Sequence, residues 1–550
     1  MARLPAFLRR LFRPRRPQWN TLGWIALSSL AWALCYPPFP LGPLAFLVLV
    51  PGFIATLRLS PRQAFAYHFA AGIVYNVVMY WWIYNVIKVG PALIIGGGLV
   101  LLILFLSLFN ALLGWMFRIL AARPFGLLAY PLLWGGLEVV RAQGEMSFPW
   151  NDMGYALGHW NALIQSVSYL GIYGFSIVVV TVNCLAFTAF RVFNTQGARG
   201  AGRAQRAQDA PSGLGFASIG FALAIPAFLA IQGGVSLSRP DSAAARSLDI
   251  SLVQPSIAQT KKWDEDYFNE VILKTWNAVD GMPRDSGIVK GSDLIVFAET
   301  AIPDFLRSRP ELYERLMHTA RATGADVLVG ALDFKSDPKP YHTYLFYNSA
   351  FLFTSDGHAP APQYSKLRLV PFSERLPFDD VFPIINYVNL GEGDFSPGQD
   401  YAIWKRGVPY APSICYEIIY PDFVRGARRR GAELLVNITN DGWFGYSNAP
   451  FMHANISRFR AIESGAPIAR CSNAGISVFY DYKGRVLGKT KLSEVTVLRR
   501  KVPMISRETW YLRHGDAVEG FLKWSFLPGF LICGFLAWRD RRRLPSSQAG

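Results

Sequence analysis

Three polar residues of this 550-residue chain end or interrupt apolar segments in its second half. They are a carboxylate, Glu299, an amine, Lys366, and a thiol, Cys415. Burial at the end of a strand raises the pKa of a carboxyl group toward the range of a general base. A buried ammonium lowers the pKa of a nearby thiol and stabilises an oxyanion, and an activated thiolate attacks carbonyl carbons. These residue types together could perform acyl transfer through a cysteine nucleophile.

Two of the three residues also have an ordinary structural explanation. Glu299 could cap a helix or belong to a structural ion pair, because a carboxylate after a strand often does so. Lys366 could be a surface lysine that pairs with Glu374, eight positions further along the chain. Taken singly, each residue favours its structural explanation, and only their combination points to chemistry.

Cys415 has alternatives of its own. It could be an inert buried thiol, or it could form a disulfide with Cys471 in an oxidising compartment. A histidine could also serve as its base, and His453 is the nearest candidate by sequence. None of the seven histidines stands in a recognisable Cys–His pattern. The chain has no HExxH motif, CxxC motif or histidine cluster, so we expect neither a metal nor a cofactor.

The segment 247–503 alternates strand-like and helix-like patterns around these residues. Short apolar runs without strict alternation are typical of strands covered on both faces by helices. The sequence therefore predicts an α/β domain. Its expected strands are 248–253, 294–298, 326–332, 348–353, 410–416, 434–438 and 476–480, and its expected helices are 267–279, 311–323, 422–430 and 452–464.

The rest of the chain is apolar enough to cross a membrane. Hydrophobic residues make up 51% of the chain and its mean hydropathy is +0.21, which is high for a soluble protein of this length. Stretches of about 20 apolar residues can span the hydrocarbon core. We therefore predict an α-helical membrane bundle of eight spans. They lie near 20–36, 42–58, 63–87, 91–118, 125–141, 160–190, 214–236 and 519–538.

The placement of basic residues predicts the orientation of these spans. Arginines cluster before the first stretch, in alternate connections and after the eighth stretch, whereas the other connections hold little more than Lys88 and Arg141. The positive-inside rule then puts both termini in the cytoplasm and 247–503 outside. The net charge of +17 is largely this orientation signal, so we expect no nucleic-acid partner.

Three parts follow from these patterns. They are a membrane domain at 1–246 with seven spans, an extracytoplasmic catalytic domain at 247–503, and a return segment at 504–550 with the eighth span and a basic cytoplasmic tail. Two other classes remain open on the residues alone: a membrane-anchored amide hydrolase and a transporter with an outer regulatory domain. Few ionisable residues lie in the spans, which disfavours a transport pathway.

The order Glu, Lys, Cys, each at a strand end, resembles the nitrilase (carbon–nitrogen hydrolase) superfamily over about 247–503. Longer motifs resemble the apolipoprotein N-acyltransferase family over nearly the whole chain. Those motifs are 370–377 (VPFSERLP), 415–417 (CYE), 440–445 (NDGWFG), 148–150 (FPW), 173–174 (YG), Trp134, Glu138, Arg141 and Gln165. The chain departs from the family pattern in the two residues before Glu299 and at Gly442, and neither departure removes a catalytic group.

The resemblance implies a four-layer αββα sandwich with a catalytic triad of Glu299, Lys366 and Cys415. It implies transfer of an acyl chain from a phospholipid, through a cysteine thioester, to the α-amine of a diacylated apolipoprotein. Tyr416 would supply a backbone amide to the oxyanion. We expect a monomer in the bacterial inner membrane, with its catalytic domain in the periplasm.

Further residues are assigned supporting roles. Glu374 is expected to orient Lys366 or to assist proton transfer, and Glu417 could act likewise. Apolar residues in loops could form a lid over acyl chains, at Trp263, 378–388 and Trp443 with its neighbours, or they could be ordinary core.

Overall fold

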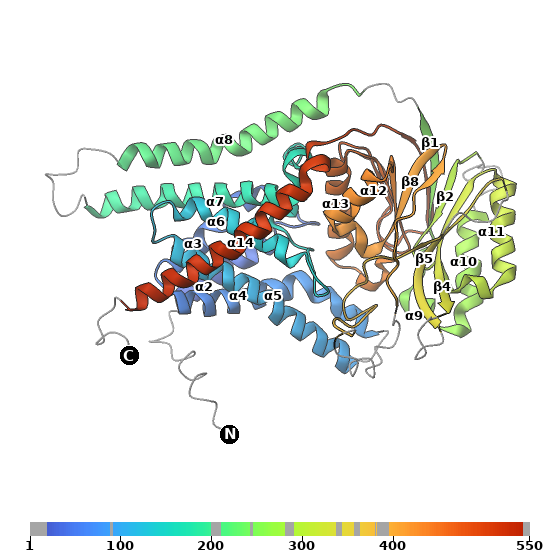
Figure 1. Ribbon diagram of the computed structural model, residues 1–550, viewed down its shortest axis with the longest axis horizontal. Helices are drawn as coiled ribbons and strands as arrows, with labels where there is room; N and C mark the ends of the chain where they lie inside the picture. The colour runs from blue at the N-terminus through green and yellow to red at the C-terminus, as the bar shows by residue number, and fades with distance from the viewer. Residues whose placement is uncertain are drawn as a thin grey trace, which may run out of the picture.

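The protein has two parts, a bundle of long helices and an α/β sandwich, which lie side by side (Figure 1). The computed structural model describes residues 19–88, 92–199, 211–241, 246–280, 291–336, 344–356, 363–379, 381 and 395–542. The chain builds most of the bundle first, then the sandwich, and returns to the bundle with its last helix (Figure 1).

The bundle contains seven long α-helices within the described residues. They are α2 (Trp19–Ala33), α4 (Pro61–Tyr80), α5 (Ala92–Leu120), α6 (Gly126–Arg141), α7 (Val167–Arg199), α8 (Pro211–Ser238) and α14 (Trp510–Arg542). Four helical segments there are long and apolar enough to cross a membrane: Ile95–Leu120, Val167–Asn194, Gly213–Ser238 and Trp510–Arg542. A membrane helical region is therefore present, and the expected number of eight spans stays a prediction.

Two apolar stretches differ from regular helices. The stretch predicted at 42–58 forms a 3₁₀ turn, η1 (Gly42–Phe46), followed by the short helix α3 (Val50–Thr56). Each piece has a proline in its first turn, where the missing amide hydrogen is tolerated. Helix α7 bends at Gly171, whose φ of 63° lies in the left-handed region that glycine adopts without strain.

A seven-stranded sheet and a six-stranded sheet form the sandwich. The first sheet has the order β13-β1-β2-β4-β5-β6, with β3 paired to β4, and the second has the order β12-β11-β10-β9-β8-β7. In each sheet the central strands are parallel: β1, β2 and β4 in the first, and β8, β9 and β10 in the second. The strands are β1 (Ser247–Gln254), β2 (Leu294–Phe297), β3 (Ile302–Phe305), β4 (Asp326–Ser336), β5 (Tyr344–Phe353), β6 (Tyr364–Ser365), β7 (Trp404–Arg406), β8 (Val408–Ile414), β9 (Leu434–Thr439), β10 (Ile468–Ser472), β11 (Val478–Tyr480), β12 (Val486–Lys489) and β13 (Thr496–Pro503).

Helices cover both outer faces, which gives the four layers that were expected. Helices α10 (Phe268–Asp280) and α11 (Pro310–Thr323) lie on the first sheet, and α12 (Pro421–Arg429) and α13 (Ala449–Ser464) lie between the second sheet and the bundle (Figure 1). The central strands β2 and β9 are buried throughout, as strands covered on both faces must be. The α/β prediction is therefore confirmed. The sequence patterns missed six strands of the two sheets: β3, β6, β7, β10, β12 and β13.

One buried arginine links the sandwich to the last helix of the bundle. Arg425 on α12 is 3% exposed and donates hydrogen bonds to Asp516, at 2.8 Å, and to Glu519, at 2.9 and 3.1 Å, on α14. Arg429, one turn further along α12, pairs with the same Asp516 but is 38% exposed. The two arginines share Asp516, and Arg425 is in addition buried and paired with Glu519, so comparing them measures what the buried part of this junction contributes.

We predict that R425A destabilises the protein far more than R429A does. Removing one partner of a buried ion pair leaves the other charge uncompensated and costs about 3 kcal/mol or more, whereas an exposed pair contributes about 1 kcal/mol or less. Thermal melting of both variants in detergent measures the difference. Equal melting temperatures would show that burial of Arg425 does not stabilise the junction.

Candidate active site

Glu299 follows strand β2 and enters the site on a tight turn. The next residue, Thr300, has φ of 43°, a conformation that costs energy for a residue other than glycine. Gly330 on the neighbouring strand β4 makes room for this turn, because a Cβ at Gly330 would lie 2.7 Å from the Cα of Glu299. The packing of two adjacent strands therefore fixes where the carboxylate stands.

The Glu299 carboxylate is 5% exposed and held from two sides. Its Oε1 accepts a hydrogen bond from Asn348 Nδ2 at 2.8 Å, and its Oε2 accepts one from the Asn440 amide at 2.7 Å. Lys366 Nζ lies 3.6 Å from Oε1. The buried Lys262 donates through Nζ to the backbone carbonyl of Glu299 at 2.9 Å. The carboxylate thus has a fixed position beside a buried ammonium.

Lys366 lies just after strand β6 and is 1% exposed. Its Nζ donates to Glu374 Oε1 at 2.8 Å, and Asn348 Nδ2 donates to the same oxygen at 3.2 Å. The other Glu374 oxygen accepts from the Val370 amide at 2.8 Å. Burial lowers the pKa of Lys366, but Glu374 and Glu299 outweigh burial and raise that pKa well above its usual value. Lys366 is therefore a permanent cation hydrogen-bonded to Glu374, and the expected role of Glu374 stays a prediction.

Cys415 begins a turn rather than ending a strand, which corrects the predicted strand 410–416. Strand β8 stops at Ile414, and Cys415 opens the 3₁₀ helix η8 (Cys415–Ile419) with φ of 50°. Such a conformation in a residue other than glycine is typical of a strained functional turn. The thiol leaves the sheet at this turn and interacts electrostatically with both Glu299 and Lys366.

The disulfide alternative is wrong, because Cys415 and Cys471 are both free thiols. Cys471 on β10 donates to the carbonyl oxygens of Val253 and Val296, on strands of the opposite sheet, at 3.3 and 3.2 Å. It is a packing residue between the sheets. Burial and the Glu299 carboxylate raise the pKa of the Cys415 thiol, and Lys366 lowers it by less. The resting thiol is therefore protonated and needs a base.

Glu417 holds the backbone around the site instead of contacting the reacting groups by hydrogen bonds. Its carboxylate accepts from the Ile414 amide at 2.7 Å, the Leu367 amide at 2.6 Å and the Tyr364 hydroxyl at 2.6 Å. Burial raises the pKa of Glu417 to about 7, although these hydrogen bonds oppose the rise. One buried side chain thereby connects the turn before Cys415 to the segment after Lys366.

Tyr416 connects the same turn to the helical bundle. Its hydroxyl donates to the Ser147 carbonyl at 2.7 Å, in the segment that follows α6, and the Ser147 hydroxyl lies 2.7 Å from that of Tyr420. A cleft of about 470 Å³ opens beside these contacts. It is lined by residues of 142–147 and 367–377 together with Tyr420 and Asp422. The site therefore lies where the sandwich meets the bundle.

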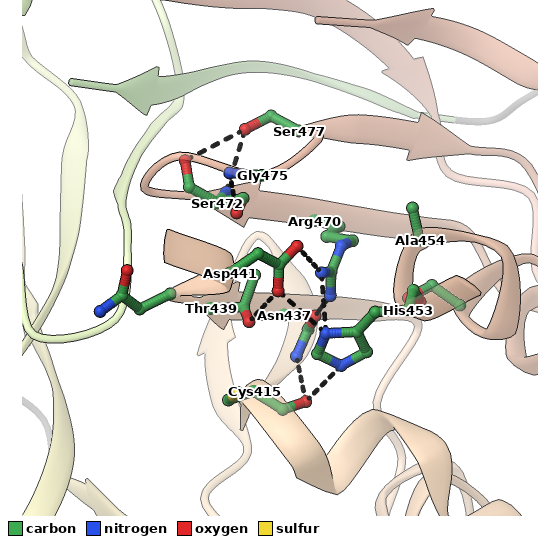
Figure 2. Close-up of polar contacts among 12 residues, drawn as sticks. Cys415, Asn437, Thr439, Asp441, His453, Ala454, Arg470, Ser472, Gly475 and Ser477 are labelled. Atoms are coloured by element: carbon green, nitrogen blue, oxygen red, sulfur yellow. Dashed lines mark hydrogen bonds and ion pairs between the residues drawn. The ribbon is translucent and has the colours of Figure 1, made fainter. Parts of the chain in front are cut away.

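His453, the alternative base, contacts the backbone of Cys415. Its Nε2 lies 3.2 Å from the Cys415 carbonyl oxygen, and its Nδ1 lies 3.0 Å from Asp441 (Figure 2). The thiol itself interacts electrostatically with Glu299, Lys366 and Asp441 and forms a hydrogen bond with Thr439. Among the described residues, no group of three His, Cys, Asp or Glu side chains is arranged to hold a metal ion.

Only some of the expected lid residues lie among the described residues. Trp263 and Trp443 are both half-buried, and the indole nitrogen of Trp263 is itself buried. Phe378 and Tyr446 are exposed, at 44% and 77%. Most of the expected lid segment 378–388 lies outside the described residues. A lid therefore stays a prediction.

Sequence reasoning missed the asparagines that hold the site. Asn348 contacts both Glu299 and Glu374, and the Asn440 backbone contacts Glu299. A signal was present: Asn348 is a polar residue in an otherwise apolar strand, where an amide must find partners. Its partners come from segments distant in the sequence, so the strand pattern alone could not name them.

Comparison with known proteins agrees with this architecture. A model of the carbon–nitrogen hydrolase family matches residues 249–511, and a model of the apolipoprotein N-acyltransferase N-terminal domain matches residues 28–185. A solved carbon–nitrogen hydrolase from Helicobacter pylori covers 51% of this chain and 94% of its own, with 16% identity and a TM-score of 0.34. The sandwich is therefore a carbon–nitrogen hydrolase domain.

Two relatives that match nearly the whole chain identify the family within this class of proteins. The apolipoprotein N-acyltransferase of Geobacter metallireducens is 32% identical over 520 residues, which are 94% of this chain and 95% of that protein. The protein of the same name from Chlorobaculum tepidum is 28% identical over 90% of this chain and 92% of its own. The chain belongs to the apolipoprotein N-acyltransferase family, and it is an acyltransferase.

The charge of Lys366 predicts how fast the Cys415 thiol reacts. K366Q removes the cation that lowers the thiol pKa, so the thiolate fraction falls and alkylation by iodoacetamide should slow. Each unit of change in the thiol pKa alters the thiolate fraction about tenfold. Alkylation of the Cys415 peptide at pH 8, followed by mass spectrometry, measures the effect. An unchanged or faster rate in K366Q would contradict the assigned charge.

Proposed function

We propose that this enzyme transfers an acyl chain from a phospholipid to the N-terminal amine of a diacylated lipoprotein, through a thioester on Cys415. Glu299 acts as the general base, Cys415 as the nucleophile and Lys366 as the cation that stabilises the oxyanion. The observation that carries this proposal is the buried cluster of these three groups, in which the thiol is protonated at rest. The names of the relatives support a lipoprotein as acceptor.

The first half-reaction forms the thioester. Glu299 takes the thiol proton as sulfur attacks the ester carbonyl carbon of the phospholipid, and a tetrahedral oxyanion results. The carbon–oxygen ester bond then breaks, Glu299 returns the proton to the leaving alcohol, and a lysophospholipid departs. In the second half-reaction the free lipoprotein amine attacks the thioester carbonyl carbon, and its proton passes to Glu299. The carbon–sulfur bond then breaks, Glu299 returns the proton to the sulfur, and an amide forms.

The oxyanion receives two donors in this scheme. One is the ammonium of Lys366, which Glu374 orients. The other is the backbone amide of Tyr416, which lies in the first turn of η8, where amides have no partner within the helix. Donors placed before the reaction stabilise a developing oxyanion more than water does, since they need no reorganisation.

Access from the membrane is part of the proposal. The cleft of about 470 Å³ lies between the bundle and the sandwich, and Leu367 and Arg368, which directly follow Lys366, line it. Part of a phospholipid could therefore extend toward Cys415 while the rest of the lipid stays in the bilayer. Trp263, 378–388 and Trp443 would cover bound acyl chains, and no cofactor takes part.

We keep the predicted organisation as part of the proposal. A membrane domain at 1–246 with seven spans precedes a periplasmic catalytic domain at 247–503, and 504–550 holds an eighth span and a cytoplasmic tail. The enzyme would act as a monomer in the bacterial inner membrane with both termini in the cytoplasm. Helix α8, whose exposed apolar side chains include Phe221 and Phe228, supports contact with lipid.

Incubation with phospholipid alone should add one acyl group to Cys415. Intact mass followed by peptide mapping detects the adduct, and a diacylated peptide should then remove it as an amide-linked third chain. C471S is the matched control: it alters another fully buried thiol of the same domain and should still acylate. An acylated C415S protein, or hydrolysis with no amide product, would contradict the proposed transfer.

The orientation can be tested separately. Alkaline phosphatase is active only outside the cytoplasm, so a fusion after residue 246 should be active and a fusion at residue 550 inactive, and green fluorescent protein should show the reverse. The expected orientation rests on the arginines, which cluster in alternate connections between the spans. Two fusions on the same side would overturn the predicted single crossing between residues 246 and 550.

A further inference from the structure

A buried polar network lies beneath the turn that carries Cys415. His453 on α13, Asp441 in the 3₁₀ helix η9 (Asp441–Phe444), Arg470 on β10 and Asn437 on β9 are each at most 1% exposed (Figure 2). Arg470 Nη2 lies 2.7 Å from Asp441 and 3.1 Å from His453 Nδ1, and Arg470 Nη1 donates to Asn437 at 2.5 Å. The proposed reaction gives no role to this network, although burying it is costly.

The partners of the His453 ring locate its hydrogen. Burial and the Arg470 charge lower the pKa of His453 despite the opposing Asp441 carboxylate, so the ring is neutral at neutral pH. The Cys415 carbonyl oxygen, 3.2 Å from Nε2, can only accept a hydrogen bond, and Arg470 can only donate one to Nδ1. A hydrogen on Nδ1 would satisfy only Asp441 Oδ1, 3.0 Å away, and would leave the lone pair of Nε2 facing the carbonyl oxygen. A hydrogen on Nε2 satisfies both the carbonyl and Arg470, so His453 donates to the Cys415 carbonyl.

Asp441 stays ionised although the His453 ring donates no hydrogen bond to it. Burial raises the pKa of Asp441, but the adjacent Arg470 charge opposes burial, and the pKa lies below its usual value. Its Oδ2 accepts from Arg470, and its Oδ1 accepts from Thr439 Oγ1 at 3.1 Å. Asp441 thereby holds Arg470 in place, and Arg470 in turn fixes the ring orientation in which Nε2 faces Cys415.

The carbonyl that His453 holds belongs to the same peptide plane as the Tyr416 amide. In a trans peptide the C=O and N–H bonds point in opposite directions. Fixing the Cys415 oxygen toward His453 therefore aims the Tyr416 N–H away from the network. Asn437 Nδ2, 3.5 Å from the same oxygen, supports this orientation. The strained φ of 50° at Cys415 makes such support necessary.

We propose that His453 is a positioning residue for acyl transfer, which holds the Cys415 carbonyl so that the Tyr416 amide faces the developing oxyanion. This inference rests on the proposed function, because it assumes that an oxyanion forms at Cys415. A positioning role can be told apart from a merely structural one. If His453 positions the amide, its loss should slow attack on a carbonyl but leave the reactivity of the thiol itself unchanged.

Two reactions of Cys415 separate these roles. Acylation by a phospholipid needs the oxyanion donor, whereas alkylation by iodoacetamide displaces iodide and forms no oxyanion. H453F keeps a ring but removes the donor, and it should slow acylation about a hundredfold, as loss of one oxyanion-hole donor does. Its alkylation rate should stay within about threefold of the wild type, and the loss should fall on kcat with KM nearly unchanged.

H453Q tests rescue, because its amide can donate to the same carbonyl. It should recover most of the acylation rate that H453F loses. H68F is the matched control, since His68 is a histidine of the helical bundle whose Nε2 lies 2.8 Å from Thr56, far from Cys415 in the fold. That variant should leave both rates unchanged. Alkylation of Cys471, which is fully buried in the folded protein, reports any unfolding.

Each result decides the question. Parallel losses of acylation and alkylation in folded H453F, or an unchanged acylation rate, would overturn the positioning role. If H453F unfolds, N437A loosens the same carbonyl from its other side, and equal losses in its two rates would have the same meaning. A wild-type protein that never acylates Cys415 would instead refute the proposed function and leave the geometry of the network untouched.

Discussion

The buried charge of Lys366 is the constraint on which the site depends. An ammonium at 1% exposure is stable only beside carboxylates, and Glu374 and Glu299 supply them at 2.8 and 3.6 Å. Those carboxylates need donors in turn, which come from Asn348 and from backbone amides. The thiol of Cys415 therefore enters a polar network that is already complete, and burial keeps it protonated until a reaction draws its proton away.

The sandwich makes this network possible by bringing together the ends of parallel strands from two sheets. Glu299 follows β2 in one sheet, and Cys415 and Asn440 follow β8 and β9 in the other. Side chains at strand ends inherit rigid backbone positions while remaining reachable from outside, which is why sites of α/β folds gather there. The strain at Thr300 and Cys415 lies at these ends, where each strand turns toward the site.

The sequence predicted the identities of the central residues better than their geometry. The α/β layers followed from apolar runs, and Glu299, Lys366 and Cys415 followed from polar interruptions of those runs together with a family resemblance. The left-handed turn at Cys415 was missed, because no glycine marks it. Asn348, Asn437 and Arg470 were also missed, because their partners are remote in the sequence and only folding brings them together. For 42–58 the sequence predicted a regular span, and the break into a 3₁₀ turn and a short helix was missed. Hydropathy does not depend on where a proline stands within a turn.

The junction between sandwich and bundle adds a last step to this view. The backbone amide of Tyr416 directly follows Cys415, while the Tyr416 hydroxyl donates to Ser147 in the bundle. The same peptide segment is thus held from below by His453, from the side by Glu417 and from the membrane-facing part by Ser147. The cleft lies beside this segment, because Ser147 and Tyr420 both line it. The contact that joins the bundle to the sandwich and the wall of the cleft therefore share the same residues.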